Sequence, residues 1–294
     1  MKNILLTGAS GFLGGNFCQF YKNIYNISAV FYNNPINVAG INVIKADLSN
    51  AHVSAELLKK TNFDFVIHLA ACSDPNFCEL NEESAYKNNV QATENIAHIC
   101  RELKIPLLFA STDLVFDGEN APYTESDKTS PIMAYGRQKA MAENIVLEAS
   151  AENNLVARLP LLYGNTFNAG KSFIQPMIEK LANKQEVFLF TDEYRTVASA
   201  RAVCEGIALL IERNCSGVYH LGGNESLSRF EMGEILCDIY GFDKKYLKPS
   251  LQKDVKMPAA RPKDVSLNNH KMLKLGWHPG TFKEQLQRIA AKPM

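Results

Sequence analysis

A glycine-rich segment directly after the first apolar run constrains this chain more than any other feature. Residues 3–6 predict a buried strand, and Gly8, Gly11 and Gly14 follow it with the spacing Gly-x-x-Gly-x-x-Gly. In a strand–turn–helix unit such glycines permit a tight turn, close approach of backbone N–H groups to a pyrophosphate, and close packing of helix on strand. An ordinary glycine-rich turn is the alternative for the segment taken alone. The residues predicted to bind phosphate are Gly8, Ser10, Gly11, Phe12, Leu13 and Gly14.

The pattern up to about residue 164 predicts an α/β fold. Short apolar runs alternate there with longer amphipathic stretches, and the runs lack the strict alternation of half-exposed strands. The predicted strands are 3–6, 27–31, 43–46, 65–69, 106–110 and 155–159, and the longest predicted helices are 82–103 and 135–150. This repeated order indicates a Rossmann-like, doubly wound parallel sheet.

The alternation loosens after residue 164. Helical patterns near 173–183, 200–213, 229–240 and 282–291 are separated by loops that contain Gly, Pro and Asn. We therefore predict an NAD(P)-binding Rossmann domain over 1–164 and a smaller, mainly substrate-binding part over 165–294. The apolar run 218–221 is a candidate strand that returns to the main sheet.

Charge and cysteine usage limit the possible partners. Lys plus Arg and Asp plus Glu number 31 each, so nothing in the net charge favours nucleic acid or an anionic membrane as partner. The seven cysteines form no C-x-x-C pair, which suits buried thiols in a reducing compartment and predicts no metal site. The first apolar run is too short for a signal peptide or a membrane span. We expect a cytoplasmic protein.

The region between Gly14 and Asp47 contains no Asp or Glu. Sites selective for NAD usually carry a carboxylate at the end of the second strand, where it binds the ribose 2′-hydroxyl. Here that end reads Phe31-Tyr32-Asn33-Asn34. A carboxylate would repel a 2′-phosphate, so its absence favours NADP(H). Because no arginine stands there to attract that phosphate, NAD(H) stays open.

Tyr135 and Lys139 lie four residues apart at the start of a predicted helix, so both can face one site. A phenol with a pKa of about 10 is a poor base at neutral pH. A nearby cation is expected to lower that pKa and to make proton exchange with a carbonyl feasible. The Tyr-x-x-x-Lys spacing is common by chance, but Thr112 stands at the predicted end of the fifth strand, where ligands gather in such sheets. Its hydroxyl can bond a substrate oxygen.

Several segments together resemble the extended short-chain dehydrogenase/reductase family, and more narrowly its dTDP-4-dehydrorhamnose reductase branch. The regulatory β subunit of methionine adenosyltransferase is similar to the same branch. The likeness extends from residue 4 to about 275. The segments that carry it are Gly11-Phe12-Leu13-Gly14, Ser111-Thr112-Asp113-Leu114-Val115-Phe116-Asp117-Gly118, Arg158-Leu159-Pro160-Leu161-Leu162-Tyr163-Gly164, Tyr194-Arg195-Thr196, Gly222-Gly223-Asn224-Glu225-Ser226-Leu227-Ser228 and Ala260-Arg261-Pro262.

The resemblance implies roles for further residues. A helix asparagine, matched by Asn89, would hold a water of the proton relay, with Asn88 as the alternative one position away. Ser111 is the corresponding alternative to Thr112. Residues expected beside the cofactor, with Tyr135 and Lys139, are Asp47, Leu48, Ala70, Ala71 and Pro160.

The resemblance also implies a nucleotide-sugar substrate and a possible homodimer. Arg195 and Arg261 are candidates to bind its pyrophosphate, because a guanidinium matches phosphate oxygens. For each of them a structural ion pair is the alternative. The favoured activity is reduction of a 4-keto sugar. Leu114 stands where dehydratases of the family carry Glu, which counts against dehydration. An epimerase and a non-catalytic, NADP-binding regulatory subunit stay open.

Overall fold

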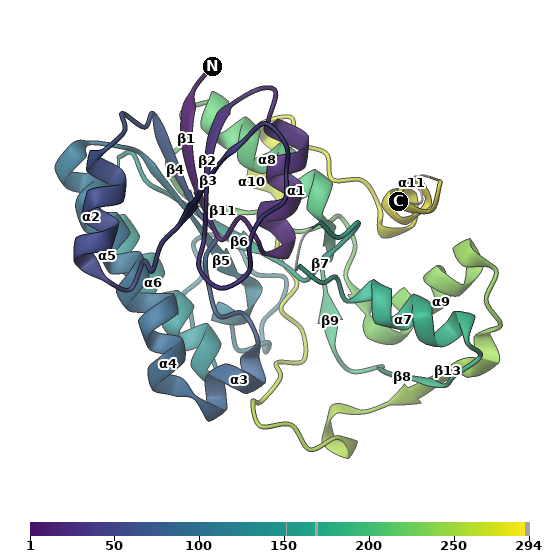
Figure 1. The fold of residues 1–294 in the computed structure, drawn as a ribbon. Coiled ribbons are helices and arrows are strands. Elements are labelled where there is room, and N and C mark those ends of the chain that lie inside the picture. Colours follow the sequence, from purple (N-terminus) through teal and green to yellow (C-terminus); the bar gives the residue numbers. More distant parts are fainter. Residues whose placement is uncertain (151, 168–169, 292–294) are drawn as a thin grey trace.

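A parallel sheet of seven strands forms the central layer of the described chain (Figure 1). The structure is a computed structural model that describes residues 1–150, 152–167 and 170–291. The strand order is β11-β6-β5-β4-β1-β2-β3, and every neighbouring pair is parallel. The strands are β1 (Asn3–Thr7), β2 (Asn26–Phe31), β3 (Asn42–Lys45), β4 (Phe65–His68), β5 (Leu107–Thr112), β6 (Leu155–Leu159) and β11 (Gly217–His220). The predicted doubly wound sheet is confirmed.

Helices cover both faces of this sheet (Figure 1). One face carries α1 (Phe12–Tyr21) and α8 (Ala200–Glu212), and the other carries α2 (Ala51–Lys59), α5 (Ala92–Leu103) and α6 (Ala134–Ala149). Side chains of β1 alternate between the two cores: Ile4 and Leu6 pack with α1 and α8, and Leu5 packs with the opposite helices. Burial of both faces explains why the strands read as continuous apolar runs. Within the described ranges, no helix combines the length and apolar character needed to cross a bilayer.

A smaller part lies beside the carboxyl ends of the strands (Figure 1). It has its own apolar core, which includes Tyr163, Leu236 and Leu286. Its helices and short strands are β7 (Leu162–Tyr163), α7 (Ile174–Ala182), β8 (Val187–Phe190), β9 (Tyr194–Arg195), β10 (Ala198–Ser199), β12 (Leu227–Ser228), α9 (Arg229–Tyr240), β13 (Leu247–Ser250) and α11 (Phe282–Ala290). Capping boxes begin α9 at Ser228 and α11 at Thr281, each satisfying N-terminal N–H groups of its helix.

Two segments depart from a simple division of the chain. The candidate return of 218–221 is confirmed, because β11 pairs in parallel with β6, and α8 packs with α1. The predicted helix 82–103 is interrupted: α4 (Glu82–Tyr86) is followed by a π-helical turn over Lys87–Gln91 before α5. In this widened turn Asn89 bonds the backbone of Cys72 rather than continuing a regular α-helical face.

Candidate active site

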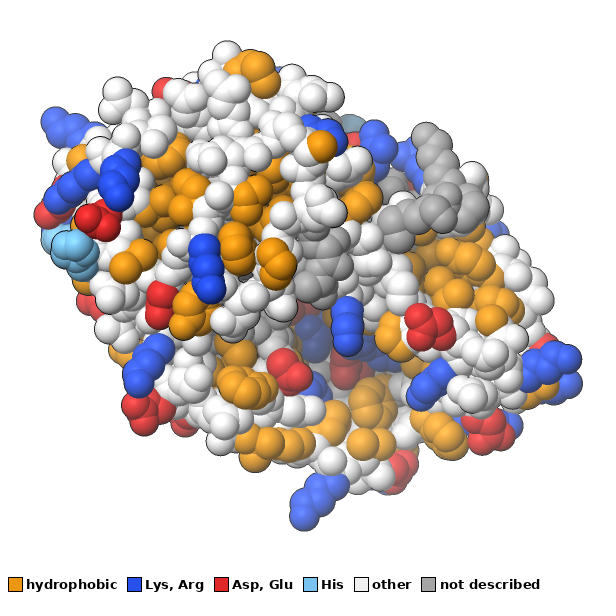
Figure 2. Space-filling model, in the orientation of Figure 1, with side chains coloured by type: hydrophobic (Ala, Val, Ile, Leu, Met, Phe, Trp, Pro, Cys, Tyr) orange, Lys and Arg blue, Asp and Glu red, His pale blue; other side chains and the backbone are white. Residues whose placement is uncertain are grey.

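A cavity of about 900 Å³ lies at the carboxyl ends of the central strands, between the sheet and the smaller part. Figure 2 shows a hollow in this region with charged side chains inside it. Parallel α/β sheets bind ligands at this edge. Among the residues predicted from the sequence, Asn89 alone does not line the cavity. Those that line it are Gly8, Ser10, Gly11, Phe12, Leu13, Gly14, Asp47, Leu48, Ala70, Ala71, Thr112, Tyr135, Lys139, Pro160, Arg195 and Arg261.

The glycine loop has no room for side chains where it turns. Gly8 has φ +66°, and a Cβ there would lie 2.5 Å from the backbone N of Ala70. A Cβ on Gly14 would lie 2.3 Å from the carbonyl oxygen of Gly8. Gly11 precedes α1 without a side-chain cap, and the first turn of α1 contains no acidic residue. The helix N-terminus therefore offers N–H groups and a positive dipole end to an anionic group in the cavity, as a dinucleotide pyrophosphate requires.

The segment after β2 forms another part of the cavity wall. Tyr32, Asn33 and Asn34, after β2, line the cavity, and none of them carries a charge. Asp47 accepts hydrogen bonds from the backbone N–H of Ser49 (3.0 Å) and from its hydroxyl (2.7 Å), so its carboxylate is held in place.

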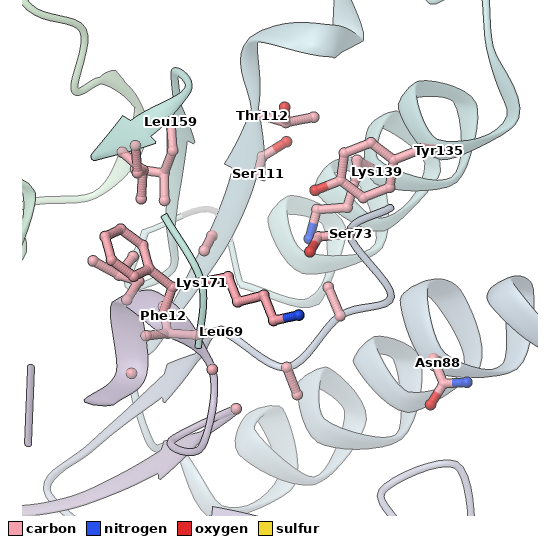
Figure 3. A pocket seen from close by; sticks show the side chains of 18 of the residues that line it. Phe12, Leu69, Ser73, Asn88, Ser111, Thr112, Tyr135, Lys139, Leu159 and Lys171 are labelled. Atoms are coloured by element: carbon pink, nitrogen blue, oxygen red, sulfur yellow. The ribbon is translucent and has the colours of Figure 1, made fainter. Parts of the chain in front are cut away.

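Lys171 is a lining residue that the sequence reasoning missed. Figure 3 shows its side chain extending into the cavity from the side of Phe12 and Leu69. The preceding residue, Gly170, passes so close to the glycine loop that a Cβ there would lie 2.4 Å from the backbone N of Phe12. An exposed lysine in a loop carries no sequence signal, since only the tertiary path of the chain brings it to the cavity.

Tyr135 and Lys139 project together from the first turns of α6 (Figure 3). The Lys139 Nζ lies 3.8 Å from the centroid of the Phe109 ring. Burial lowers the pKa of Lys139 to about 7, and the nearby Glu143 opposes this shift. Burial raises the pKa of the Tyr135 phenol above its ordinary value, Cys78 and Asp113 raise it further, and a hydrogen bond to Thr112 opposes them.

The raised pKa of Tyr135 corrects the sequence argument, which expected a lowered value. Desolvation of the phenolate is the largest cause of the raised pKa, because Tyr135 is buried. The phenol is accordingly neutral at neutral pH.

Two neighbouring hydroxyls at the end of β5 differ in their partners. The Ser111 hydroxyl donates to Glu143. The Thr112 hydroxyl donates to Asp113 (3.1 Å) and accepts from the N–H of Leu114 (3.2 Å). Both residues line the cavity (Figure 3). Since each hydroxyl donates its proton to a carboxylate, the choice of Thr112 over Ser111 stays a prediction.

Asn89 is buried behind the cavity wall. Its side chain accepts from the N–H of Cys72 (2.8 Å) and donates to the carbonyl of Cys72 (3.0 Å) and to Gln138 (2.8 Å). These bonds position the chain after β4. Asn88, the alternative one position away, does line the cavity. The water-holding role of Asn89 stays a prediction.

A charged cluster forms the opposite end of the cavity. Arg195 pairs with Asp113 (2.8 Å) and Glu193 (3.6 Å), and Arg229 pairs with Glu193 (3.0 Å). The ion-pair alternative for Arg195 is therefore what the structure shows, although the residue still lines the cavity. Burial alone would raise the pKa of Glu193, but Arg195 and Arg229 hold it below its ordinary value. With Arg261, three guanidinium groups stand against two carboxylates here, which leaves an excess of positive charge.

Arg229 and Glu193 were missed by the sequence reasoning. Arg229 begins α9, and its guanidinium lies over the ring of Phe173 (5.1 Å). Nothing local marks either residue, because each reaches the cavity only through the packing of the smaller part.

Comparison with known proteins agrees with this geometry. The family described as the RmlD substrate binding domain matches residues 1–293. The chain belongs to this family. A relative of this RmlD-family chain is the probable low-salt glycan biosynthesis reductase Agl14 of Haloferax volcanii, 30% identical over 97% of this chain and 96% of that protein. Another is the mouse methionine adenosyltransferase 2 subunit beta, 29% identical over 94% of this chain and 83% of that protein.

Solved structures extend the comparison. A dTDP-4-dehydrorhamnose reductase from Clostridium acetobutylicum is 26% identical, covers 98% of both chains and superposes with a TM-score of 0.85. A dTDP-4-dehydrorhamnose reductase from Bacillus anthracis, solved in complex with NADP, covers 99% of both chains with a TM-score of 0.88. At 22% identity the second likeness shows the fold alone. These comparisons confirm the resemblance of this RmlD-family chain to the dTDP-4-dehydrorhamnose reductase branch. They also confirm its resemblance to the β subunit of methionine adenosyltransferase.

Proposed function

We propose that this chain uses NADPH to reduce the 4-keto group of a nucleotide sugar. The observation that carries the proposal is that Thr112, Tyr135 and Lys139 line the same cavity as the glycine loop. Residues 1–164 would bind the cofactor and the later residues would cover the substrate, apart from α8 and β11, which pack on the sheet. The uncapped start of α1 and the glycines without space for a Cβ fit a dinucleotide pyrophosphate.

The chain's own residues supply the proton and the positioning. NADPH, when bound, supplies the hydride. Tyr135, whose raised pKa keeps the phenol protonated, donates its proton to the carbonyl oxygen as negative charge develops there. Thr112 holds that oxygen by a hydrogen bond. Lys139 stabilises the phenolate that remains, because a buried anion favours the charged form of a neighbouring amine.

The substrate end is suited to a diphosphate. Arg195, Arg229 and Arg261 line it with an excess of positive charge over Asp113 and Glu193. Guanidinium groups recognise phosphate oxygens in a fixed, forked geometry. A relative that carries the name of a glycan biosynthesis reductase supports a sugar substrate of this class.

A substrate screen tests this proposal. Nucleotide 4-keto sugars with dTDP, UDP and GDP as carriers would be mixed with the protein and NADPH, and the loss of reduced-cofactor absorbance would be followed. We expect oxidation with at least one of them. If NADPH is oxidised with none of these sugars, at NADPH concentrations that saturate its binding, the result would contradict a reductase function.

A second candidate is a binding protein that performs no turnover. The likeness to the methionine adenosyltransferase 2 subunit beta, over 94% of this chain, favours it. Co-elution with a methionine adenosyltransferase catalytic subunit in size-exclusion chromatography would support this candidate. Turnover of a nucleotide sugar without such a complex would support the reductase.

A further inference from the structure

Two cysteines outside the proposed proton relay lie against each other at the edge of the cavity. Cys72 follows Ala71 on the segment that leaves β4, and Cys78 lies in α3 (Pro75–Leu80). Their Sγ atoms are 3.7 Å apart, and the Cys78 thiol also contacts the carbonyl oxygen of Cys72 at 3.3 Å. The two sulfurs are therefore in van der Waals contact without a covalent bond.

The surrounding structure holds this pair in place. The amide of Asn89 bonds both backbone groups of Cys72, and its Nδ2 lies 3.8 Å from the Cys78 Sγ. Asp74 caps α3 by accepting from the N–H groups of Asn76 (2.8 Å) and Phe77 (3.1 Å). Segment 72–78 is thus a short loop, fixed at both ends, that returns one cysteine to the other.

The two thiols differ in reactivity. The hydrogen bond from Cys78 lowers the pKa of Cys72 to about 7, whereas the same bond and burial raise the pKa of Cys78. Cys72 is half-buried and Cys78 is buried. A thiolate that a reagent can reach and a second thiol behind it are the arrangement of an attacking and a resolving cysteine.

The other cysteines provide a contrast. Cys18, Cys100, Cys204 and Cys237 are buried, and burial raises the pKa of each thiol. Cys215 is half-buried and serves as the accessible comparison.

We propose that Cys72 and Cys78 form a reversible intramolecular disulfide by exchange with a low-molecular-weight disulfide such as oxidised glutathione. The Cys72 thiolate attacks one sulfur of the reagent, forms a mixed disulfide and releases one thiolate. The Cys78 sulfur, losing its proton to a released thiolate, then attacks the Cys72 sulfur and expels the second. Two protein thiols are oxidised and one reagent disulfide is reduced to two thiols.

Bond formation would alter the wall of the cavity. The sulfurs must approach from 3.7 Å to about 2.05 Å, which pulls segment 72–78 together. Ser73 and Pro75 in this segment line the cavity, and the Asn76 side chain accepts a hydrogen bond from Arg261 (3.0 Å).

The effect also reaches the proposed proton donor. Cys78 packs in one buried cluster with Tyr135 and Leu114, and Cys72 packs against this cluster. We expect the oxidised protein to turn over severalfold more slowly than the reduced protein. This part rests on the proposed function, whereas formation of the disulfide does not.

Mass spectrometry of the full chain tests the proposal without any activity assay. Both cysteines lie in the single tryptic peptide 61–87, so the disulfide makes that peptide two hydrogen masses lighter and blocks its alkylation. We expect this at oxidised glutathione concentrations where Cys215 stays free, with full reversal by dithiothreitol. Glutathione that persists on Cys72, or a peptide that stays reduced while Cys215 reacts, would overturn the proposal.

Variants separate the two cysteines. Cys78→Ser should trap glutathione on Cys72, Cys72→Ser should leave Cys78 unmodified, and Cys215→Ser should form the disulfide as the wild type does. Equal modification of Cys72 and Cys78 in the single variants would contradict the assigned order of attack. If no substrate is found, the fluorescence of NADPH bound to the dithiol and disulfide forms of the protein shows whether the cavity changes. Failure of the proposed function can thus be distinguished from failure of the disulfide proposal.

Discussion

The carboxylate of Glu143 and the guanidinium of Arg158 form a buried, bidentate ion pair behind the proposed proton relay. Arg158 Nε and Nη2 lie 3.0 Å and 2.8 Å from the two carboxylate oxygens. The Ser111 hydroxyl also donates to this carboxylate, and Arg158 Nη1 lies 3.3 Å from His220 Nε2. Glu143 follows Lys139 by one turn of α6, so the pair ties the helix of the relay to β5, β6 and β11.

Removal of one partner of this pair should strongly destabilise the fold. Glu143→Gln keeps the size of the side chain but leaves the Arg158 charge buried without its counter-ion. We expect the free energy of unfolding to fall by about 3–5 kcal/mol, as for other buried pairs that lose one partner. Denaturant unfolding measures this change.

An exposed ion pair on the same protein provides the control. Arg201 and Glu205 pair at 3.0 Å with side chains more than half exposed. Glu205→Gln should cost about 0–1 kcal/mol. Equal losses for the two variants would mean that burial of the Glu143 pair does not govern its contribution.

The buried ammonium of Lys139 should make stability depend on pH. Its pKa is about 7 in the fold and 10.5 when unperturbed, so the unfolded chain binds more protons between these values. Stability from this group therefore rises with pH across that window, and below it the fold bears the full cost of burying the charge. Lys139→Met removes this cost. The stability of the variant relative to wild type should fall by about 4 kcal/mol between about pH 6 and about pH 10.

Lys171→Met is the matched control for this effect, since its side chain is exposed. Thermal or denaturant unfolding at both pH values should give a nearly constant difference from wild type for that variant. A constant difference for Lys139→Met as well would show that the Lys139 ammonium is not desolvated in the fold.

The end of β2 should decide cofactor preference. Asn33 lines the cavity and is exposed, and its sequence neighbours Tyr32 and Asn34 are uncharged. Asn33→Asp introduces a negative charge where a 2′-phosphate would lie. We expect NADPH affinity to fall by about tenfold or more while NADH affinity is kept or improved, because like charges repel. Fluorescence titration of both cofactors measures this.

Lys171→Ala is the comparison for the cofactor experiment. Its side chain enters the cavity on the side of the glycine loop, so its loss should weaken NADPH and NADH alike. Wild-type protein that clearly prefers NADH would overturn the preference proposed for NADPH.

The sequence was sufficient for the sheet because most of its strands are short, continuous apolar runs separated by helical patterns. The sequence did not predict the break in the helix expected over 82–103. A π-helical turn interrupts it, and in this turn the Asn89 side chain bonds Cys72. Those bonds join residues 17 positions apart, a separation that the repeat of a helical pattern does not reveal.

For the site, motifs were informative where the functional residues lie within a few positions of one another in the sequence. The glycine loop and the pair Tyr135 and Lys139 are of this kind, and all line the cavity. Arg229 and Lys171 come from isolated positions that only the tertiary fold brings to the cavity. The direction of the Tyr135 pKa shift could not be predicted from the sequence either. The spacing of the motif reveals a neighbouring cation but not how deeply the phenol is buried.

The phenol of Tyr135 is the group on which the proposed function depends most directly. Turnover and NADPH affinity should therefore be measured together for Tyr135→Phe, with a substrate that the wild type reduces. The account predicts that turnover is lost while NADPH affinity stays close to the wild-type value, because only the transferable proton is removed. Turnover at the wild-type rate would contradict the proton-donor role of Tyr135.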